Sequence, residues 1–251
     1  MKVKISIVSY LNSLPFLFGL KNSPIINDIE LSLDIPSKCA EKLLTNQVDI
    51  GLVPVAILPQ LKHYQILSDY CIGANKKVNS VILVSDVPLN DIEEILLDYQ
   101  SKSSINLVQV LARKYWKITP KFTHASVGFE NQVNNKTAAV IIGDRTFNLN
   151  KPYAYIYDLA EEWNKFTGLP FAFACWVANK PIAPEMVEKL NEAFSFGVNH
   201  IPEAIGLANN NGITFEQLQH YLTNHISYEL NDDKRKSIQL FLEYLAENVN
   251  I

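Results

Sequence analysis

Short apolar runs alternate along this chain with stretches in which apolar residues recur at helical spacing. At the start, Val3, Ile5 and Ile7 alternate with polar residues, which is typical of a strand with one buried face. Similar runs predict further strands at residues 31–35, 48–53, 80–84, 138–142, 153–157 and 171–178. Strands that alternate with helices indicate an α/β fold with a mostly parallel sheet covered by helices.

Helix-start and helix-stop residues separate these strands. Pro15 suits the first turn of a short helix, and Pro36 and Ser37 can begin a second helix that ends at Asn46 in the left-handed conformation. Further starts are expected at Ser101 or Ser103, at Asp158 with Glu161, and at Thr214 with Gln217, while Gly168 and Pro170 are expected to close the helix after Asp158. The chain is expected to be helical from Pro184 onward, apart from short connections.

The best candidates for domain boundaries are strands that cross between two lobes, near residues 84–88 and 172–178. We therefore expect one lobe from residues 1–86 and 177–251, and a second lobe from residues 87–176. The sequence contains neither an internal repeat nor a low-complexity linker.

Composition narrows the possible partners and compartments. The 251 residues include 48% hydrophobic residues, 22 Lys and Arg and 26 Asp and Glu, which is typical of a globular protein and makes nucleic acid an unlikely partner. No apolar run approaches the ~20 residues that span a bilayer, so no membrane partner is expected. The three cysteines are too few and too dispersed for a disulfide framework, and the histidines lack a zinc-binding spacing, so we expect a cytoplasmic protein without a metal.

The start of the chain needs a separate interpretation, because Lys2 and Lys4 precede an apolar region that resembles a signal peptide. Polar residues and Pro15 interrupt that region, and no small-residue cleavage site follows it. The alternation from Val3 to Ile7 favours a strand instead.

Candidate chemistry gathers where the predicted strands end. The loops after three strands are residues 10–15, Pro54-Val55-Ala56 and Gly143-Asp144-Arg145. Ligands of open α/β sheets bind beyond the carboxyl ends of the strands, so these loops and Ser80 are expected to line one cleft. The helix start at residues 101–104 supplies hydroxyl and N–H groups that suit a carboxylate.

Each of these features also fits a structural role. Asn12 and Asp144 can stabilise turns, and the serines can cap a helix. The chain has no Ser/His/Asp arrangement, glycine-rich phosphate loop or HExxH motif. Residue chemistry alone therefore indicates a two-lobed α/β protein that binds a small carboxylate.

Six segments, taken in their order and spacing, carry a family resemblance. They are Tyr10-Leu11-Asn12-Ser13-Leu14-Pro15, Pro36-Ser37-Lys38-Cys39-Ala40, Val48-Asp49-Ile50-Gly51-Leu52-Val53-Pro54-Val55, Ser80-Val81-Ile82-Leu83-Val84-Ser85, Ala139-Val140-Ile141-Ile142-Gly143-Asp144, and Gly168-Leu169-Pro170-Phe171-Ala172-Phe173-Ala174 with Trp176. Together they resemble the chorismate dehydratase family of the futalosine pathway of menaquinone biosynthesis. The chain departs from the family pattern at Asn46-Gln47, usually Gly-Glu, and at Thr137 and Arg145-Thr146-Phe147.

The resemblance implies a two-lobed fold of the type II periplasmic-binding-protein kind, with two crossover strands and a central cleft. It implies a hydro-lyase, a carbon–oxygen lyase that converts chorismate to 3-[(1-carboxyvinyl)oxy]benzoate without a cofactor, as a monomer or homodimer. Asn12 and Ser80 are the expected catalytic residues, Asn12 orienting the substrate while the substrate's enolpyruvyl carboxylate acts as base. The expected substrate-binding residues are Tyr10, Ser37, Pro54, Val55, Ser101, Ser103, Ser104, Gly143 and Asp144.

Two other interpretations stay open at this point. A 1,4-dihydroxy-6-naphthoate synthase-like enzyme of the same pathway would share the fold but is expected to need a catalytic histidine, for which His124 is the candidate. A non-enzymatic solute-binding protein for a small carboxylate would also share the fold, and the missing signal peptide argues against it.

Overall fold

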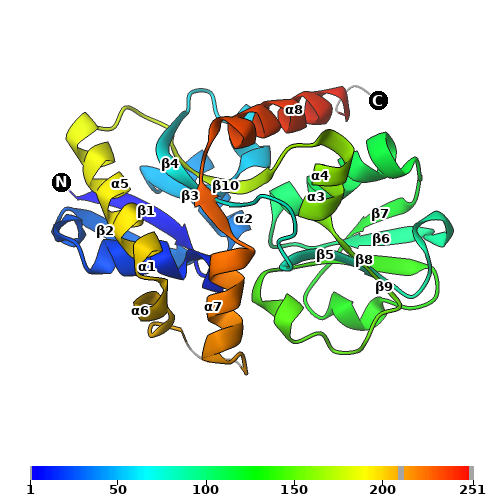
Figure 1. Ribbon diagram of the computed structural model, residues 1–251. Helices are drawn as coiled ribbons and strands as arrows, with labels where there is room; N and C mark the ends of the chain where they lie inside the picture. Colours follow the sequence, from blue (N-terminus) through cyan, green and yellow to red (C-terminus); the bar gives the residue numbers. More distant parts are fainter. Residues whose placement is uncertain (1, 209–211, 249–251) are drawn as a thin grey trace.

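The computed structural model, which describes residues 2–208 and 212–248, contains two separate β-sheets with helices packed around them (Figure 1). In order across the first sheet, the strands are β11 (Ser227–Glu229), β4 (Gln65–Ala74), β10 (Phe171–Ala178), β3 (Ile50–Pro54), β1 (Val3–Val8) and β2 (Ile29–Asp34). In the second sheet they are β7 (Lys121–His124), β6 (Glu94–Leu97), β8 (Thr137–Ile142), β5 (Val81–Ser85) and β9 (Tyr155–Asp158). The predicted two-lobed α/β architecture is confirmed.

Both sheets are mixed, although the sequence pattern predicted a mostly parallel one. In the first sheet β1 runs parallel to β2 and β3, but β10 runs antiparallel to β3 and β4. In the second sheet β6 runs parallel to β7 and β8, while β5 runs antiparallel to β8 and β9. The direction of β10 differs because the chain returns to the first sheet from the other lobe and not through a βαβ crossover within one sheet.

The sheet pairing also corrects the expected lobe boundaries at 86/87 and 176/177. β5 pairs only with strands of the second sheet, and β10 lies in the middle of the first. The chain thus passes between the sheets before each of these strands, at residues 75–80 and between β9 and β10. The error arose because every residue of β5 and β10 is buried, and a fully apolar run does not reveal which sheet it joins.

The helices of the first half begin and end much as the sequence predicted. Helix α1 (Leu14–Lys21) has Pro15 in its first turn, and α2 (Pro36–Leu44) is followed by Asn46 at φ 57°. Ser101 caps α3 (Lys102–Val110), which continues as a π-helical turn, Leu111–Trp116. Asp158 caps α4 (Leu159–Thr167), and Gly168 ends it at φ 75°. These caps place the ends of the helices, and with them the loops of the cleft.

The helices of the last quarter are α5 (Pro184–Asn199), α6 (Ile201–Ile205), α7 (Phe215–Asn224) and α8 (Asp232–Asn248). Thr214 and Gln217 form the predicted capping box at the start of α7. In Figure 1, α5 and α1 lie side by side on the first sheet, and α7 stands at the boundary between the two sheets. The position of α7 allows a residue from this late part of the chain to reach the cleft.

Candidate active site

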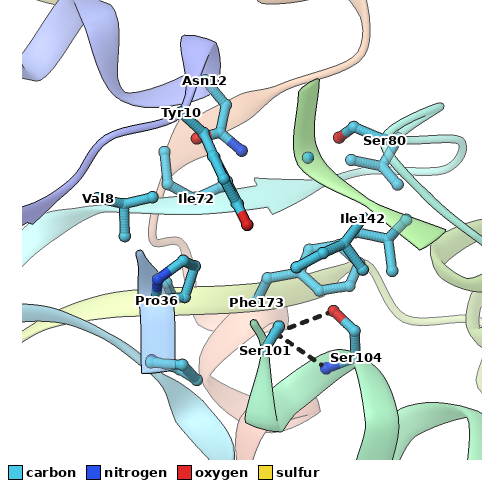
Figure 2. A pocket seen from close by; sticks show the side chains of 15 residues that line it. Val8, Tyr10, Asn12, Pro36, Ile72, Ser80, Ser101, Ser104, Ile142 and Phe173 are labelled. Atoms are coloured by element: carbon cyan, nitrogen blue, oxygen red, sulfur yellow. Dashed lines mark hydrogen bonds between the residues drawn. The ribbon is translucent and has the colours of Figure 1, made fainter. Parts of the chain in front are cut away.

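A cavity lies between the two sheets, where β1, β3 and β8 end and α3 begins (Figure 2). Its polar lining consists of Tyr10, Asn12, Ser80, Ser101 and Ser104. The rest of the lining is Val8, Pro36, Pro54, Ile72, Val78, Val81, Ile142, Gly143, Phe173 and Ala174. None of these 15 residues has a charged side chain at neutral pH, so the cavity is an apolar pocket with a few hydroxyl and amide groups.

Tyr10 lies across this cavity and limits its volume to about 40 Å³. Its hydroxyl donates to Gln100 Oε1, which joins a loop of the first lobe to the second lobe. Burial raises the pKa of Tyr10 far above its ordinary value, so the phenol keeps its proton. Because this space is too small for a ring, Tyr10 or one lobe would have to move for a ligand of that size to enter.

Asn12 lies in the short 3₁₀ turn Leu11–Ser13 that follows β1. The hydroxyl of Ser13 donates to the Tyr10 carbonyl at 2.8 Å, and the Tyr228 hydroxyl donates to the Asn12 carbonyl at 3.0 Å, so the turn is held from both sides. The side-chain oxygen Oδ1 of Asn12 is buried without a hydrogen-bond partner among the described residues. A buried acceptor without a partner is costly, so this atom is suited to a ligand that carries a donor.

Ser80 precedes β5 and is 1% exposed. Its Oγ accepts a hydrogen bond from the Tyr221 hydroxyl at 2.7 Å, and its carbonyl accepts from the Gly143 N–H at 2.9 Å. Gly143 has φ 64°, and a Cβ atom at this position would lie 2.7 Å from the Tyr10 ring. A glycine is therefore needed here both for the backbone conformation and for the space that Tyr10 occupies.

Ser101 and Ser104 bring the first turn of α3 to the cavity (Figure 2). Ser101 Oγ accepts from the Ser104 N–H at 3.3 Å and from the Ser104 hydroxyl at 3.1 Å. The proton of the Ser101 hydroxyl is thus available to an anion, at a helix end where the dipole also favours negative charge.

Four predicted binding residues lie outside the lining: Ser37, Val55, Ser103 and Asp144. Val55 is fully buried, and the Ser37 N–H donates to the Gln100 carbonyl at 2.9 Å. The Ser103 hydroxyl donates to the Phe173 carbonyl at 2.8 Å and accepts from the Ala56 N–H at 3.3 Å. Ser37 and Ser103 thus join the two lobes behind the cavity, because alternate positions of a helix start or strand end point to opposite sides.

Asp144 also joins the lobes. Its carboxylate accepts from the Leu11 N–H at 3.1 and 3.3 Å and faces a neighbouring groove beside Leu17 and Leu33. Burial raises the pKa of Asp144 to about 6. Asp144 thus lies next to the cavity and contacts the 3₁₀ turn that carries Asn12.

Arg145, where the chain departs from the family pattern, points away from the cavity. Its guanidinium pairs with Asp98, and with Glu130 at 2.6 Å, and lies near the rings of Tyr99 and Phe129. Arg145 therefore holds the turn after β8 in place within the second lobe, and it is not part of the cavity lining.

The sequence analysis missed two groups of residues at this site. The apolar lining, including Ile72 and Phe173, comes from central strands, and only their strand character was predicted. Tyr221 and Tyr228 come from α7 and β11, far along the chain from every loop that was considered. A helical stripe in α7 is the only sequence signal that could have indicated that Tyr221 is buried.

Among the described residues, the titratable side chains form no metal site, and no histidine lines the cavity. Within residues 2–208 and 212–248, no three His, Cys, Asp or Glu side chains are placed to hold a metal ion. His124 ends β7, is exposed, and does not line the cavity. No helix in the described part of the chain is long and apolar enough to cross a membrane.

The two mixed sheets, with a cavity between them, define a periplasmic-binding-protein-like fold. Solved structures agree: protein AF1704 from Archaeoglobus fulgidus has a TM-score of 0.77 at 12% identity, over 100% of this chain and 98% of that one. The periplasmic aliphatic sulphonate binding protein SsuA from Escherichia coli has a TM-score of 0.61 at 16% identity, over 100% and 88%. At these identities the likeness concerns the fold alone.

The sequence comparison is more specific. Residues 3–247 match the family described as menaquinone biosynthesis, and the chain belongs to that family. Among its relatives, the chorismate dehydratase of Thermus thermophilus is 26% identical over 84% of this chain and 85% of the relative. The chorismate dehydratase of Campylobacter jejuni is 25% identical over 94% of each chain.

Proposed function

We propose that this protein is a chorismate dehydratase, a hydro-lyase that eliminates water from chorismate to give 3-[(1-carboxyvinyl)oxy]benzoate. The observation that carries the proposal is Asn12, which lines a mostly apolar cavity and whose side-chain oxygen is buried without a hydrogen-bond partner among the described residues. The full-length match to the menaquinone biosynthesis family and the names of the two relatives support it.

The cavity offers groups for the ring hydroxyl and for one carboxylate of such a substrate. Asn12 Oδ1 accepts from the ring hydroxyl, and the Ser80 hydroxyl donates to its oxygen as the carbon–oxygen bond breaks. Ser101 and Ser104 hold a carboxylate at the start of α3. The apolar walls, among them Ile72, Ile142 and Phe173, enclose the ring and exclude water, which strengthens each of these hydrogen bonds.

The proton lost in the elimination comes from the ring carbon that carries the enolpyruvyl ether. The cavity lining has no histidine, carboxylate or lysine, and the Tyr10 phenol keeps its proton. An amide is not basic enough to take the proton either. The enolpyruvyl carboxylate of the substrate is therefore the base, and the proton that it takes leaves with the released hydroxyl as water. Aromatisation drives the reaction, so the protein mainly has to orient the reacting atoms.

The two other interpretations have less support. A naphthoate synthase-like mechanism expects a histidine in the cleft, and His124 is exposed and outside it. A solute-binding role rests on neighbours of low sequence identity, which carry the fold alone. We place the enzyme in the futalosine pathway of menaquinone biosynthesis and in the cytoplasm, acting on free chorismate without a cofactor.

The test is to incubate the purified protein with chorismate and follow the product by chromatography and mass spectrometry. We expect an aromatic product lighter than chorismate by one water, formed in proportion to protein and absent without it. Binding of chorismate without turnover would support the solute-binding interpretation, and neither binding nor turnover would refute the proposal.

A further inference from the structure

Tyr221 is a buried tyrosine of α7 that reaches the site from behind without lining the cavity. It is 3% exposed, and its hydroxyl donates to Ser80 Oγ at 2.7 Å. The edge of its ring packs against Phe147 at a centroid distance of 4.9 Å, which fixes the direction of the phenol. Tyr221 is thus a rigid group whose only polar atom contacts an expected catalytic residue.

Ser80 is oriented by the same contact. Its Oγ accepts from Tyr221, and within residues 2–208 and 212–248 no hydrogen bond donated by its hydroxyl is found. The Ser80 proton is therefore free to be donated into the cavity. The Tyr221 phenol thus determines that Ser80 presents a donor to the cavity.

We propose that Tyr221 is a positioning residue that directs the hydroxyl proton of Ser80 toward the substrate. The inference rests on the proposed function for its kinetic consequence, since Ser80 is assigned to the reacting hydroxyl of chorismate. Tyr228 has a different task, because its hydroxyl holds only the backbone carbonyl of Asn12.

The kinetic test is a double-mutant cycle on chorismate with Tyr221→Phe, Ser80→Ala and the double variant. Tyr221→Phe removes one oxygen atom and should lower kcat by about tenfold or more with a smaller change in KM, as for the loss of one positioning hydrogen bond. In the Ser80→Ala background the same change should cost clearly less, because residues of one network are not additive. If the two losses in kcat simply multiply in the double variant, or if kcat is unchanged in Tyr221→Phe, the inference is overturned.

Tyr153→Phe is the matched control, because Tyr153 is also buried and its hydroxyl contacts Asn150 Oδ1 at 2.8 Å, away from the cavity. It should leave kcat and KM unchanged. Thermal unfolding of all variants checks that each is folded.

A second measurement needs no turnover. In crystal structures, Ser80 Oγ should lie within hydrogen-bond distance of the Tyr221 hydroxyl in the wild type, and the Ser80 side chain should adopt another rotamer in Tyr221→Phe, because the donor that holds it is lost. If the wild type does not convert chorismate, the proposed function fails while this comparison still judges Tyr221, and an unchanged Ser80 rotamer would refute its positioning role.

Discussion

Replacement of Asp144 by Asn should make the protein more stable at neutral pH, and the gain should depend on pH in a defined way. Asp144 is partly buried, has no cationic partner in the described structure, and accepts only from the Leu11 N–H. Asn is nearly the same size and can still accept from that N–H through its amide oxygen. The substitution therefore removes a poorly solvated charge and keeps the contact between the lobes.

The size of the effect comes from the pKa of Asp144, which burial raises from 3.8 to about 6. At 1.36 kcal/mol for each pH unit, such a rise corresponds to about 3 kcal/mol. Because Asp144 retains some solvent exposure, we expect Asp144→Asn to raise the free energy of unfolding at neutral pH by about 1 to 3 kcal/mol.

The sign follows from the proton balance. Below pH 4 the carboxyl is neutral in both the folded and the unfolded chain, so its burial costs little. Between pH 4 and 6 the unfolded chain releases the proton while the folded protein keeps it, so the stabilisation is lost progressively as pH rises. Above pH 6 Asp144 is charged in both states and the full cost is present.

Urea unfolding of the wild type and Asp144→Asn at pH 4, 5, 6 and 7 measures this directly. The difference in unfolding free energy should be near zero at pH 4 and reach its plateau by pH 7. Asp91→Asn, at an exposed position, is the control and should change stability little at any pH. A variant less stable than the wild type at pH 7, or a difference that does not vary with pH, would refute the reasoning.

Three further predictions concern the cavity itself. Asn12→Ala should lower kcat on chorismate by about 10²-fold with a smaller change in KM. Asn12→Asp places a negative charge beside a dianion and should raise KM as well. Steady-state kinetics, with circular dichroism to check that each variant is folded, tests this, and a near-normal kcat in folded Asn12→Ala would mean that the turn is only structural. Ser104→Ala should raise KM about threefold to tenfold and lower stability only slightly, since it removes a single hydrogen bond to Ser101. The adjacent Ser103→Ala should instead lower stability by about 1–3 kcal/mol, because it leaves the Ala56 N–H and the Phe173 carbonyl without their partner. Calorimetric unfolding and kinetics of both variants should separate the two roles, and equal effects would contradict this. Gly143→Ala should lower kcat/KM at least about tenfold, because alanine is strained in the backbone conformation at φ 64° and its Cβ atom would displace the Tyr10 ring. Wild-type kinetics in this variant would show that Tyr10 can move freely.

Local patterns were sufficient for most elements that border the cavity. The alternation at residues 3–8 and the apolar runs before Pro54 and Gly143 predicted β1, β3 and β8, and Ser101, Asp158 and Thr214 were found as helix caps. These signals are reliable because they depend on a few neighbouring residues, either the two faces of a strand or the free N–H groups of one helix turn. The long strand β4 was missed, since Ser68 and Asp69 interrupt its apolar pattern.

The sequence alone was sufficient for the α/β class, for the loops that end the strands and, through six ordered segments, for the family resemblance. The packing of the elements shows that β5 belongs to the second sheet and β10 to the first, that Asp144 and Ser103 join the lobes behind the cavity, and that Tyr221 lies behind Ser80. Ser80 and Tyr221 are 141 positions apart, and their contact depends on how α7 packs at the boundary between the sheets. Spacing along a chain carries no information about such a contact, because it is set by the packing of whole elements and not by their local preferences.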